Sequence, residues 1–259
     1  MSLVKLRTNK LTILYTGNHE ISITDVSDKF NTVRKKNSIV IVGRNVRISV
    51  STEFFVSDFF RNAIFFDYAG ITTIKRILTL TYNSDFNNPF NFDTISGNIN
   101  KIVSFSADDE CIRDYYDEIK SSHTMHDSIL NFFLLCKKAE VENKVFPLVY
   151  SSAVNTFCNK IIDTLESDIS KKWTLQLLSE KFNLSEITIR KKLELEGVKF
   201  KELMLEIKMK TAISMLIGGK KSISQIGNEL GYKNISYFIL LFKDFFGLTP
   251  KQFQLSFIR

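Results

Sequence analysis

The sequence lacks the features that mark membrane, exported and disulfide-bonded proteins. Its longest apolar stretches, such as residues 39–42 and 132–135, are far shorter than the roughly 20 residues that a membrane-spanning helix needs. Residues 1–10 carry charge and contain no apolar core of a signal peptide, so we expect a cytoplasmic protein with no membrane partner. Cys111, Cys136 and Cys158 are odd in number and far apart in the sequence, which favours reduced thiols over a disulfide framework.

Motifs that mark common enzymes are also missing. The sequence has no glycine loop that cradles phosphates, no GxSxG nucleophile elbow and no evident pair of catalytic acids. His123 and His126 have a spacing that puts both on one helical face, but no cysteine or carboxylate cluster completes a zinc site. The sequence therefore predicts no catalytic residue, no metal and no cofactor, and hence a protein that is not an enzyme.

The size and the charge distribution point to a soluble globular chain with a basic C-terminal part. The 259 residues, 44% of them apolar and 24% charged, fit one large domain or two ordinary ones. Residues 151–259 contain 17 Lys and Arg against 11 Asp and Glu, a net charge of +6, whereas the rest of the chain has +1. An excess of this kind raises affinity for polyanions, nucleic acid first and anionic lipid second.

The N-terminal half has the pattern of a small β unit followed by helices. Residues 11–15, 20–26, 38–42 and 46–51 are rich in Ile, Val, Thr and Phe and are separated by Gly and Asn, which predicts an antiparallel sheet closing into a barrel or a sandwich.

Beyond this β unit, helical periodicity begins at Ile71, and a further helix is expected to open at Asp127 or Ser128. Residues 83–100 have the composition of a loop. The helices would pack on their own β unit or on a second copy of the chain. The stretch around Pro147 is the best boundary, giving a regulatory and dimerisation domain at 1–148 and a DNA-binding domain at 149–259.

The C-terminal half contains the same pattern twice: a helix, a short turn and a second helix. Thr174 is placed to cap one helix, Ser185 to cap the next at 186–196, and Gly197 to end it. After a long amphipathic helix at 200–216, Ser222 is placed to cap a helix at 223–230, and another follows at 236–246. A duplicated helix-turn-helix on one connecting helix fits two successive major grooves of DNA.

The expected DNA contacts follow from the outward faces of the two second helices. In the first, Ile189 and Leu193 face inward, while Arg190 and Lys191 are suited to base edges or phosphates. In the second, phosphate contacts are expected because few side chains could read bases. The DNA-binding residues predicted from sequence are Glu186, Ile187, Arg190, Lys191, Lys192, Lys233, Asn234, Ser236 and Lys243. The alternative for the basic residues is a solvated face. Ile239 and Leu240 would either contact thymine methyl groups or form a surface covered by another protein.

These stretches resemble the C-terminal region of the AraC/XylS family of bacterial transcription regulators. The resemblance rests on GYKNISYF at 231–238, FK at 242–243 and FGLTPKQF at 246–253, with WTL at 173–175, LSEITIRKKL at 184–193 and EGVKF at 196–200. Weaker similarity to the virulence activators of this family runs through NKLTILYTGN at 9–18 and GRNVRISV at 43–50. Leu240 stands where many members carry a polar or basic residue.

The resemblance implies an α+β chain with an N-terminal small cupin-like β-barrel, dimerisation helices and an all-α C-terminal double helix-turn-helix. It implies activation of virulence promoters, with promoter DNA, RNA polymerase and a second copy of the chain as partners. It also implies a small carboxylate effector, such as a fatty acid, bound between the domains by Lys10, Lys220 and Lys221. The enzymatic alternative is alkyl-transfer DNA repair, because one branch of the family uses sacrificial cysteines; that chemistry needs four clustered thiolates, and this chain has three scattered ones.

Overall fold

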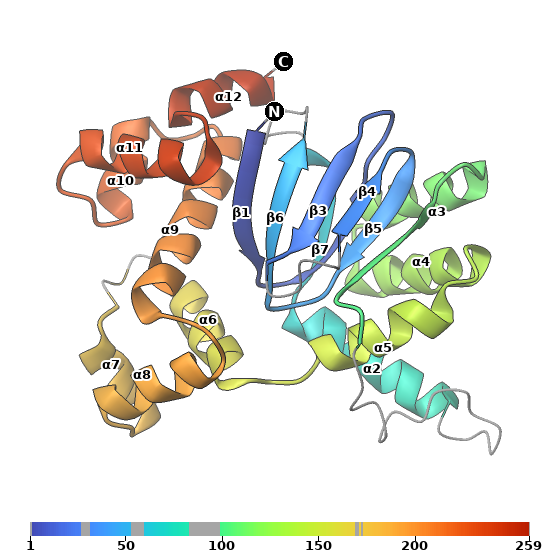
Figure 1. The fold of residues 1–259 in the computed structure, drawn as a ribbon, viewed down its shortest axis with the longest axis horizontal. Helices are drawn as coiled ribbons and strands as arrows, with labels where there is room; N and C mark the ends of the chain where they lie inside the picture. The colour runs from blue at the N-terminus through green and yellow to red at the C-terminus, as the bar shows by residue number, and fades with distance from the viewer. Residues whose placement is uncertain are drawn as a thin grey trace. The chain divides into compact units, whose positions relative to one another are not determined.

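The chain folds into two compact units, which we call unit 1 (Met1–Val154) and unit 2 (Asn155–Arg259). The computed structural model describes residues 2–26, 32–52, 60–82, 99–168, 171 and 173–258 (Figure 1). The domain boundary expected after residue 148 falls inside a helix, α5 (Glu142–Ser152), and the units divide after Val154 instead. Most of the loop expected at 83–100 lies outside the described residues.

Unit 1 is built on two four-stranded sheets, ordered β1-β6-β3-β4 and β7-β2-β5-β8. Every recorded pair of neighbouring strands is antiparallel. The strands are β1 (Ser2–Thr8), β2 (Leu11–Tyr15), β3 (Ile21–Asp25), β4 (Thr32–Lys35), β5 (Ser38–Val42), β6 (Val46–Thr52), β7 (Ala63–Phe66) and β8 (Ile102–Ser106). The predicted strands are thus present, whereas the sequence reading missed β1, β4, β7 and β8.

Burial shows that the second sheet is covered on both faces. All residues of β5 are buried, although successive side chains of a strand point to opposite faces. One face, with Ile39 and Ile41, packs in a core with the helices of unit 1. The first sheet buries alternate positions such as Ile21 and Ile23, so we infer that this face covers the other side of β5.

The two sheets do not close into the barrel that the family resemblance implies; of the two arrangements expected from the strand pattern, a barrel or a sandwich, the barrel is wrong. Among the described strands, no ladder joins an edge of one sheet to an edge of the other. Alternation of apolar residues specifies which face of a strand is buried, but it carries no information on whether sheet edges meet. The α+β class itself is confirmed.

The helices of unit 1 supply the outer layer of this core. They are α2 (Tyr68–Tyr82), α3 (Glu110–Ser121), α4 (Met125–Lys138) and α5. The predicted start of α4 at Asp127 or Ser128 was late, because the side chain of Thr124 accepts a hydrogen bond from the Asp127 backbone N–H and caps the helix there. The sequence reading also missed α3, whose N-cap is Asp109.

Unit 2 is entirely helical in its described part. Its helices are α6 (Phe157–Ser167), α7 (Leu175–Phe182), α8 (Glu186–Leu195), α9 (Phe200–Ile217), α10 (Ile223–Glu229), α11 (Ile235–Phe246) and α12 (Pro250–Ile258). Thr174, Ser185 and Ser222 cap α7, α8 and α10 through their side chains, as predicted.

The long helix α9 buries different faces at its two ends. Leu203 and Ile207, near its start, belong to the core around α6, α7 and α8. Ala212 and Leu216, near its end, are also buried but lie on the opposite side of the helix, since successive residues turn by roughly 100°. One helix-turn-helix therefore packs against each side of α9, with α10 and α12 contacting its second half (Figure 1).

Candidate nucleic-acid interface

The first helix-turn-helix consists of α7, a tight turn and α8. Asn183 adopts the left-handed conformation at φ 51° and its backbone N–H donates to the Ser179 carbonyl, which ends α7. Ser185 then starts α8, accepting a hydrogen bond from the Thr188 backbone N–H at 3.1 Å. These local contacts set the angle at which α8 leaves the turn.

The outer face of α8 carries the residues predicted to read DNA. Ile189 and Leu193 are 0% exposed and fix the inner face in the core. On the rest of the helix, Glu186, Ile187, Arg190, Lys191 and Lys192 are all exposed. Ile187 keeps 67% of its surface accessible, so this face offers an apolar side chain among charged ones.

The predicted residues of α8 do not all point the same way. Arg190 forms an ion pair with Glu186 one turn earlier, with 3.8 Å between Nη2 and Oε2. Lys192 lies at the other flank, with Nζ 5.6 Å from the centre of the Phe157 ring. Lys191 lies between these two flanks and projects farthest from the core, since it is diametrically opposite Ile189 and Leu193.

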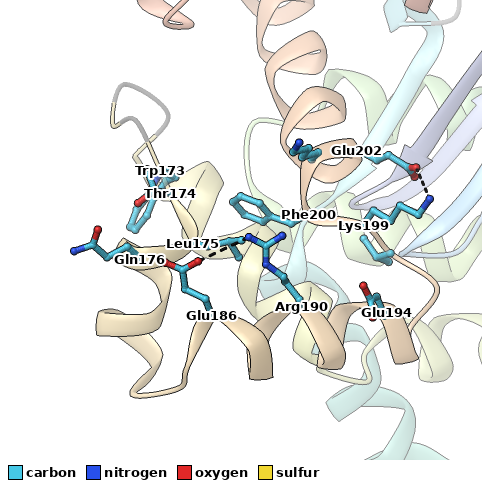
Figure 2. A pocket seen from close by; sticks show the side chains of 12 residues that line it. Trp173, Thr174, Leu175, Gln176, Glu186, Arg190, Glu194, Lys199, Phe200 and Glu202 are labelled. Carbon is cyan, nitrogen blue, oxygen red and sulfur yellow. Dashed lines mark ion pairs between the residues drawn. The ribbon is translucent and has the colours of Figure 1, made fainter.

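A groove with a volume of about 770 Å³ adjoins α8 on the side of Arg190. We call it the reading groove. Figure 2 shows Arg190 and Glu186 reaching from α8 toward the start of α7 and the start of α9. Its lining also includes Lys199 and Lys201, which follow the turn after α8. The three cations of the groove are matched by three carboxylates, those of Glu186, Glu194 and Glu202. Its attraction for a phosphate is therefore local, at exposed cations and at the backbone N–H groups of two helix starts.

The second helix-turn-helix consists of α10, a turn at Gly231 and α11. Gly231 has a φ of 81°, and Gly227 lets α11 approach so closely that an added Cβ would lie 2.8 Å from Ile235 Cδ1. Phe238, Phe242 and Phe246 are 0% exposed and form the inner face.

The outer face of α11 is less basic than that of α8. Lys233, Asn234, Ser236 and Lys243 are exposed, as expected. The side-chain oxygen of Asn234 accepts a hydrogen bond from the Tyr237 backbone N–H at 3.1 Å, which leaves its amide nitrogen to face a phosphate. Tyr237 and Leu240 are each 54% exposed beside these residues.

The sequence reading missed one contact that supports the first reading helix. The carboxylate of Glu196, just after α8, accepts hydrogen bonds from the backbone N–H groups of Phe157 and Cys158 at 2.9 and 3.0 Å. No local signal could reveal it, because its partners are 39 and 38 residues away.

The three lysines proposed to hold an effector are all exposed. Lys10 lies between β1 and β2, and Lys220 lies between α9 and α10. Lys221 pairs with Glu229, with 2.5 Å between Nζ and Oε2. An incoming carboxylate would therefore compete with Glu229 for Lys221.

The cysteines offer little support to a nucleophilic role. Cys136 and Cys158 are buried and Cys111 is exposed. Burial raises the pKa of the Cys136 thiol, which opposes formation of the thiolate that attacks an alkyl group. Within the described residues, no group of three or more His, Cys, Asp and Glu side chains is placed to hold a metal ion. None of the helices described is long and apolar enough to cross a membrane.

Two helix-turn-helix units with exposed outer faces, joined by one helix, define a DNA-binding module of the transcription-regulator type. A family model described as a helix-turn-helix domain matches residues 178–256. The Escherichia coli transcriptional activator AggR is 33% identical to this chain, over 96% of this chain and 91% of the length of AggR. The dual transcriptional regulator Rns, from the same species, is 32% identical to this chain, over 95% of this chain and 90% of the length of Rns.

The fold is also similar to solved structures of ToxT from Vibrio cholerae. One of them aligns with 98% of this chain over 93% of the ToxT chain, with a TM-score of 0.70 at 16% identity. A second, bound to an unsaturated fatty acid, has a TM-score of 0.68 at 17% identity and covers 98% and 90%. The chain belongs to the AraC/XylS family of helix-turn-helix transcription regulators.

Proposed function

We propose that the protein binds promoter DNA sequence-specifically and activates transcription. The observation that carries this proposal is the outer face of α8, where Arg190 and Lys191 are exposed while Ile189 and Leu193 anchor the opposite face. A helix held in this way can enter a major groove roughly 12 Å wide without disturbing its own core. Arg190 would read a base and Lys191 would bind a phosphate or a base edge.

The test is selection of binding sites from a random duplex library, followed by titration of a selected and a scrambled duplex. Specific readout predicts tighter binding to the selected duplex by a factor of roughly 10³ or more. Equal affinity for both duplexes would contradict the proposal. Lys191→Ala should weaken binding to both, because a phosphate contact carries no sequence information.

The genes under control would be virulence genes. The relatives supporting this step include the virulence regulon transcriptional activator VirF of Shigella flexneri, 26% identical over 97% of the chain. Deleting the gene in its host should lower transcripts of the operons whose promoters carry the selected sequence, and complementation should restore them. Transcripts that stay unchanged would refute activation at those promoters. This role would be performed in the cytoplasm, where promoter DNA and RNA polymerase meet.

We further propose a small carboxylate such as a fatty acid as effector, with Lys10, Lys220 and Lys221 as its cationic partners. Support comes from the ToxT structure described as bound to an unsaturated fatty acid. Mass spectrometry of lipid extracted from the purified protein, followed by titration with oleate, tests this step. Loss of binding in Lys10→Ala supports it; protein that carries no lipid and ignores added oleate overturns it.

Unit 1 would also be the dimerisation domain. Leu130 and Leu134 are 60% and 38% exposed and lie one turn apart on α4, an apolar stripe that a second copy could cover. Sedimentation analysis should show self-association that Leu130→Asp with Leu134→Asp weakens. Leu80→Asp on α2, where the leucine is 68% exposed, is the matched control and should leave it unchanged.

A further inference from the structure

A second concavity in unit 2, about 210 Å³ in volume, lies where the segment before α7, helix α9 and the turn after α10 meet. We call it the central hollow. Its apolar floor includes Leu165 and Met204, and its lining includes Lys171, Trp173, Lys208 and Gly231. Trp173 and Gly231 belong to stretches that resemble the family, but none of these lining residues is among the DNA contacts predicted from sequence.

The central hollow lies between the two reading helices. It shares Trp173 and Thr174 with the reading groove, whose lining also includes Arg190 of α8. The lining of the central hollow also includes Gly231, which is two residues before Lys233 and four before Ile235, the first residue of α11. The reading groove and the central hollow are therefore adjacent, and their linings extend from Arg190 of α8 to Gly231 before α11.

The cations of this hollow are held over aromatic rings. Lys171 Nζ lies 4.4 Å from the centre of the Trp173 ring, and Lys208 Nζ lies 5.0 Å from that of Tyr232. Lys181 approaches the same indole at 5.5 Å. Cation–π contact limits the freedom of a lysine before binding, so less side-chain entropy is lost when a phosphate is bound.

The charge of the lining favours an anion. Lys171 and Lys208 are accompanied by one carboxylate, Glu229, and Lys221 neutralises that carboxylate at 2.5 Å. The ion pair also draws the acidic group toward Lys221 and reduces its repulsion of an approaching phosphate.

The geometry of B-DNA indicates which part of a duplex would lie near the central hollow. Two major-groove segments on one side of a duplex are roughly 34 Å apart, and the minor groove with its two phosphate backbones faces the protein between them. The 18 residues of α9 span about 27 Å at roughly 1.5 Å per residue, so both reading helices can meet the same side of a duplex. On such a duplex the minor groove would cross the part of unit 2 between the two reading helices, where the lining of the central hollow lies.

We propose that the central hollow is a third DNA contact, in which Lys171 and Lys208 bind backbone phosphates at the edges of the minor groove between the two reading helices. Trp173 supports Lys171 and packs against a deoxyribose. This inference rests on the proposed DNA-binding function. It adds a site that would fix the position of the duplex relative to the two helix-turn-helix motifs of unit 2. It assigns no base readout to these residues.

The experiment measures the affinity of the full chain for two duplexes, the one selected by the wild-type protein and a scrambled one, over a series of salt concentrations. Each phosphate contact contributes about −0.9 to the slope of log K against log salt. Lys171→Gln with Lys208→Gln should therefore make the slope shallower by about 1.8 and weaken both duplexes by the same factor. Lys160→Gln, on the exposed side of α6 and outside both concavities, is the control for the loss of a surface lysine charge and should keep the wild-type slope.

Hydroxyl-radical footprinting of the same complexes supplies the second readout. The wild-type protein should protect the sugars on both edges of the minor groove between the two major-groove footprints, and the double variant should lose this central protection alone. A wild-type slope and footprint in the double variant, while Arg190→Ala loses affinity, would overturn the inference and leave the proposed function standing. Failure of the wild-type protein to bind either duplex would refute the proposed function itself.

Discussion

The carboxylate of Glu196 holds the backbone N–H of Phe157 at 2.9 Å, so the residue that follows the first reading helix also caps the first helix of unit 2. The second oxygen of the same carboxylate accepts from Cys158. A negative charge at a helix start is favourable because the first backbone N–H groups of the helix lack intrahelical partners. Helix α6 is the first element after the connection to unit 1, which makes Glu196 the link between that connection and α8.

Replacing Glu196 should destabilise unit 2. Glu196→Ala removes two hydrogen bonds to a charged acceptor, each worth about 1.5–3 kcal/mol before solvent screening is discounted. Since the site is partly exposed, we expect a loss of about 1–3 kcal/mol in total, measured by urea unfolding. Glu194→Ala, at an exposed position of α8, should shift the unfolding midpoint little. Equal midpoints for both variants would contradict the capping role.

The Glu186–Arg190 pair should restrain DNA binding rather than stabilise the fold. Both side chains are about half exposed, at 46% and 55%, and exposed pairs contribute roughly 0–1 kcal/mol. Glu186→Gln should therefore leave the free energy of unfolding nearly unchanged and tighten binding to both the selected and the scrambled duplex, because a negative charge facing phosphates is removed. Weaker binding to the selected duplex alone would show instead that Glu186 reads a base.

Arg190→Ala should act on specificity. A bidentate arginine–guanine contact discriminates by about 1–3 kcal/mol, roughly 5- to 150-fold. We expect that loss on the selected duplex, together with relaxed preference at one base position when site selection is repeated with the variant. An unchanged selected sequence would remove Arg190 from base readout.

Tyr232 should make unit 2 sensitive to alkaline pH. Burial, and next the neighbouring Tyr237, raise the pKa of Tyr232 to about 12 from an ordinary value of 10.0. The folded state then keeps the phenol neutral while the unfolded chain ionises it, so the stabilising contribution is complete below pH 10 and is lost as the pH rises toward 12. Tyr232→Phe should lose less stability than the wild-type protein across that window in urea unfolding. Identical pH profiles for the two proteins would contradict this assignment.

Gly227 should tolerate no side chain. In Gly227→Ala the new Cβ would lie 2.8 Å from Ile235 Cδ1 and 3.2 Å from Phe238 Cδ1. Overpacking costs about 1–3 kcal/mol, against the roughly 1 kcal/mol that alanine gains over glycine within a helix. We expect the upper part of that range because the Phe238 ring, which is fully buried, cannot move aside. We expect a net loss of stability and weaker DNA binding through a displaced α11. Gly218→Ala, where the nearest atoms are 3.5 and 3.6 Å away, is the control and should be neutral or slightly stabilising.

The sequence predicts unit 2 better than unit 1, for a physical reason. Ser185 and Ser222 start helices through hydrogen bonds to residues three positions later, and such local contacts are visible in a sequence. Strand β8 contains β-forming residues of its own, but five residues are a weak signal, and the strand pairs with β5, whose residues lie 60 to 68 positions earlier.

Pro147 shows a second limit of local patterns. It suggested a break in the chain, yet it lies inside α5 between buried neighbours such as Phe146 and Leu148. A proline inside a helix costs about 3 kcal/mol, and burying several large side chains at roughly 1.5–3 kcal/mol each outweighs that cost. Likewise, the outward residues of α8 follow from helical periodicity, whereas the central hollow depends on three segments meeting in space.

Because the two ends of α9 pack against different helix-turn-helix motifs on opposite sides, this helix acts as a ruler: its length fixes the distance between the two reading helices, and its helical twist fixes the angle between them. Inserting one alanine at its exposed Ser214 would rotate the second reading helix by roughly 100° about the ruler and push it outward by about 1.5 Å. The two halves of a binding sequence must therefore be separated by a constant number of base pairs, and promoters with that spacing altered by half a helical turn would escape control by this chain even if both halves were intact.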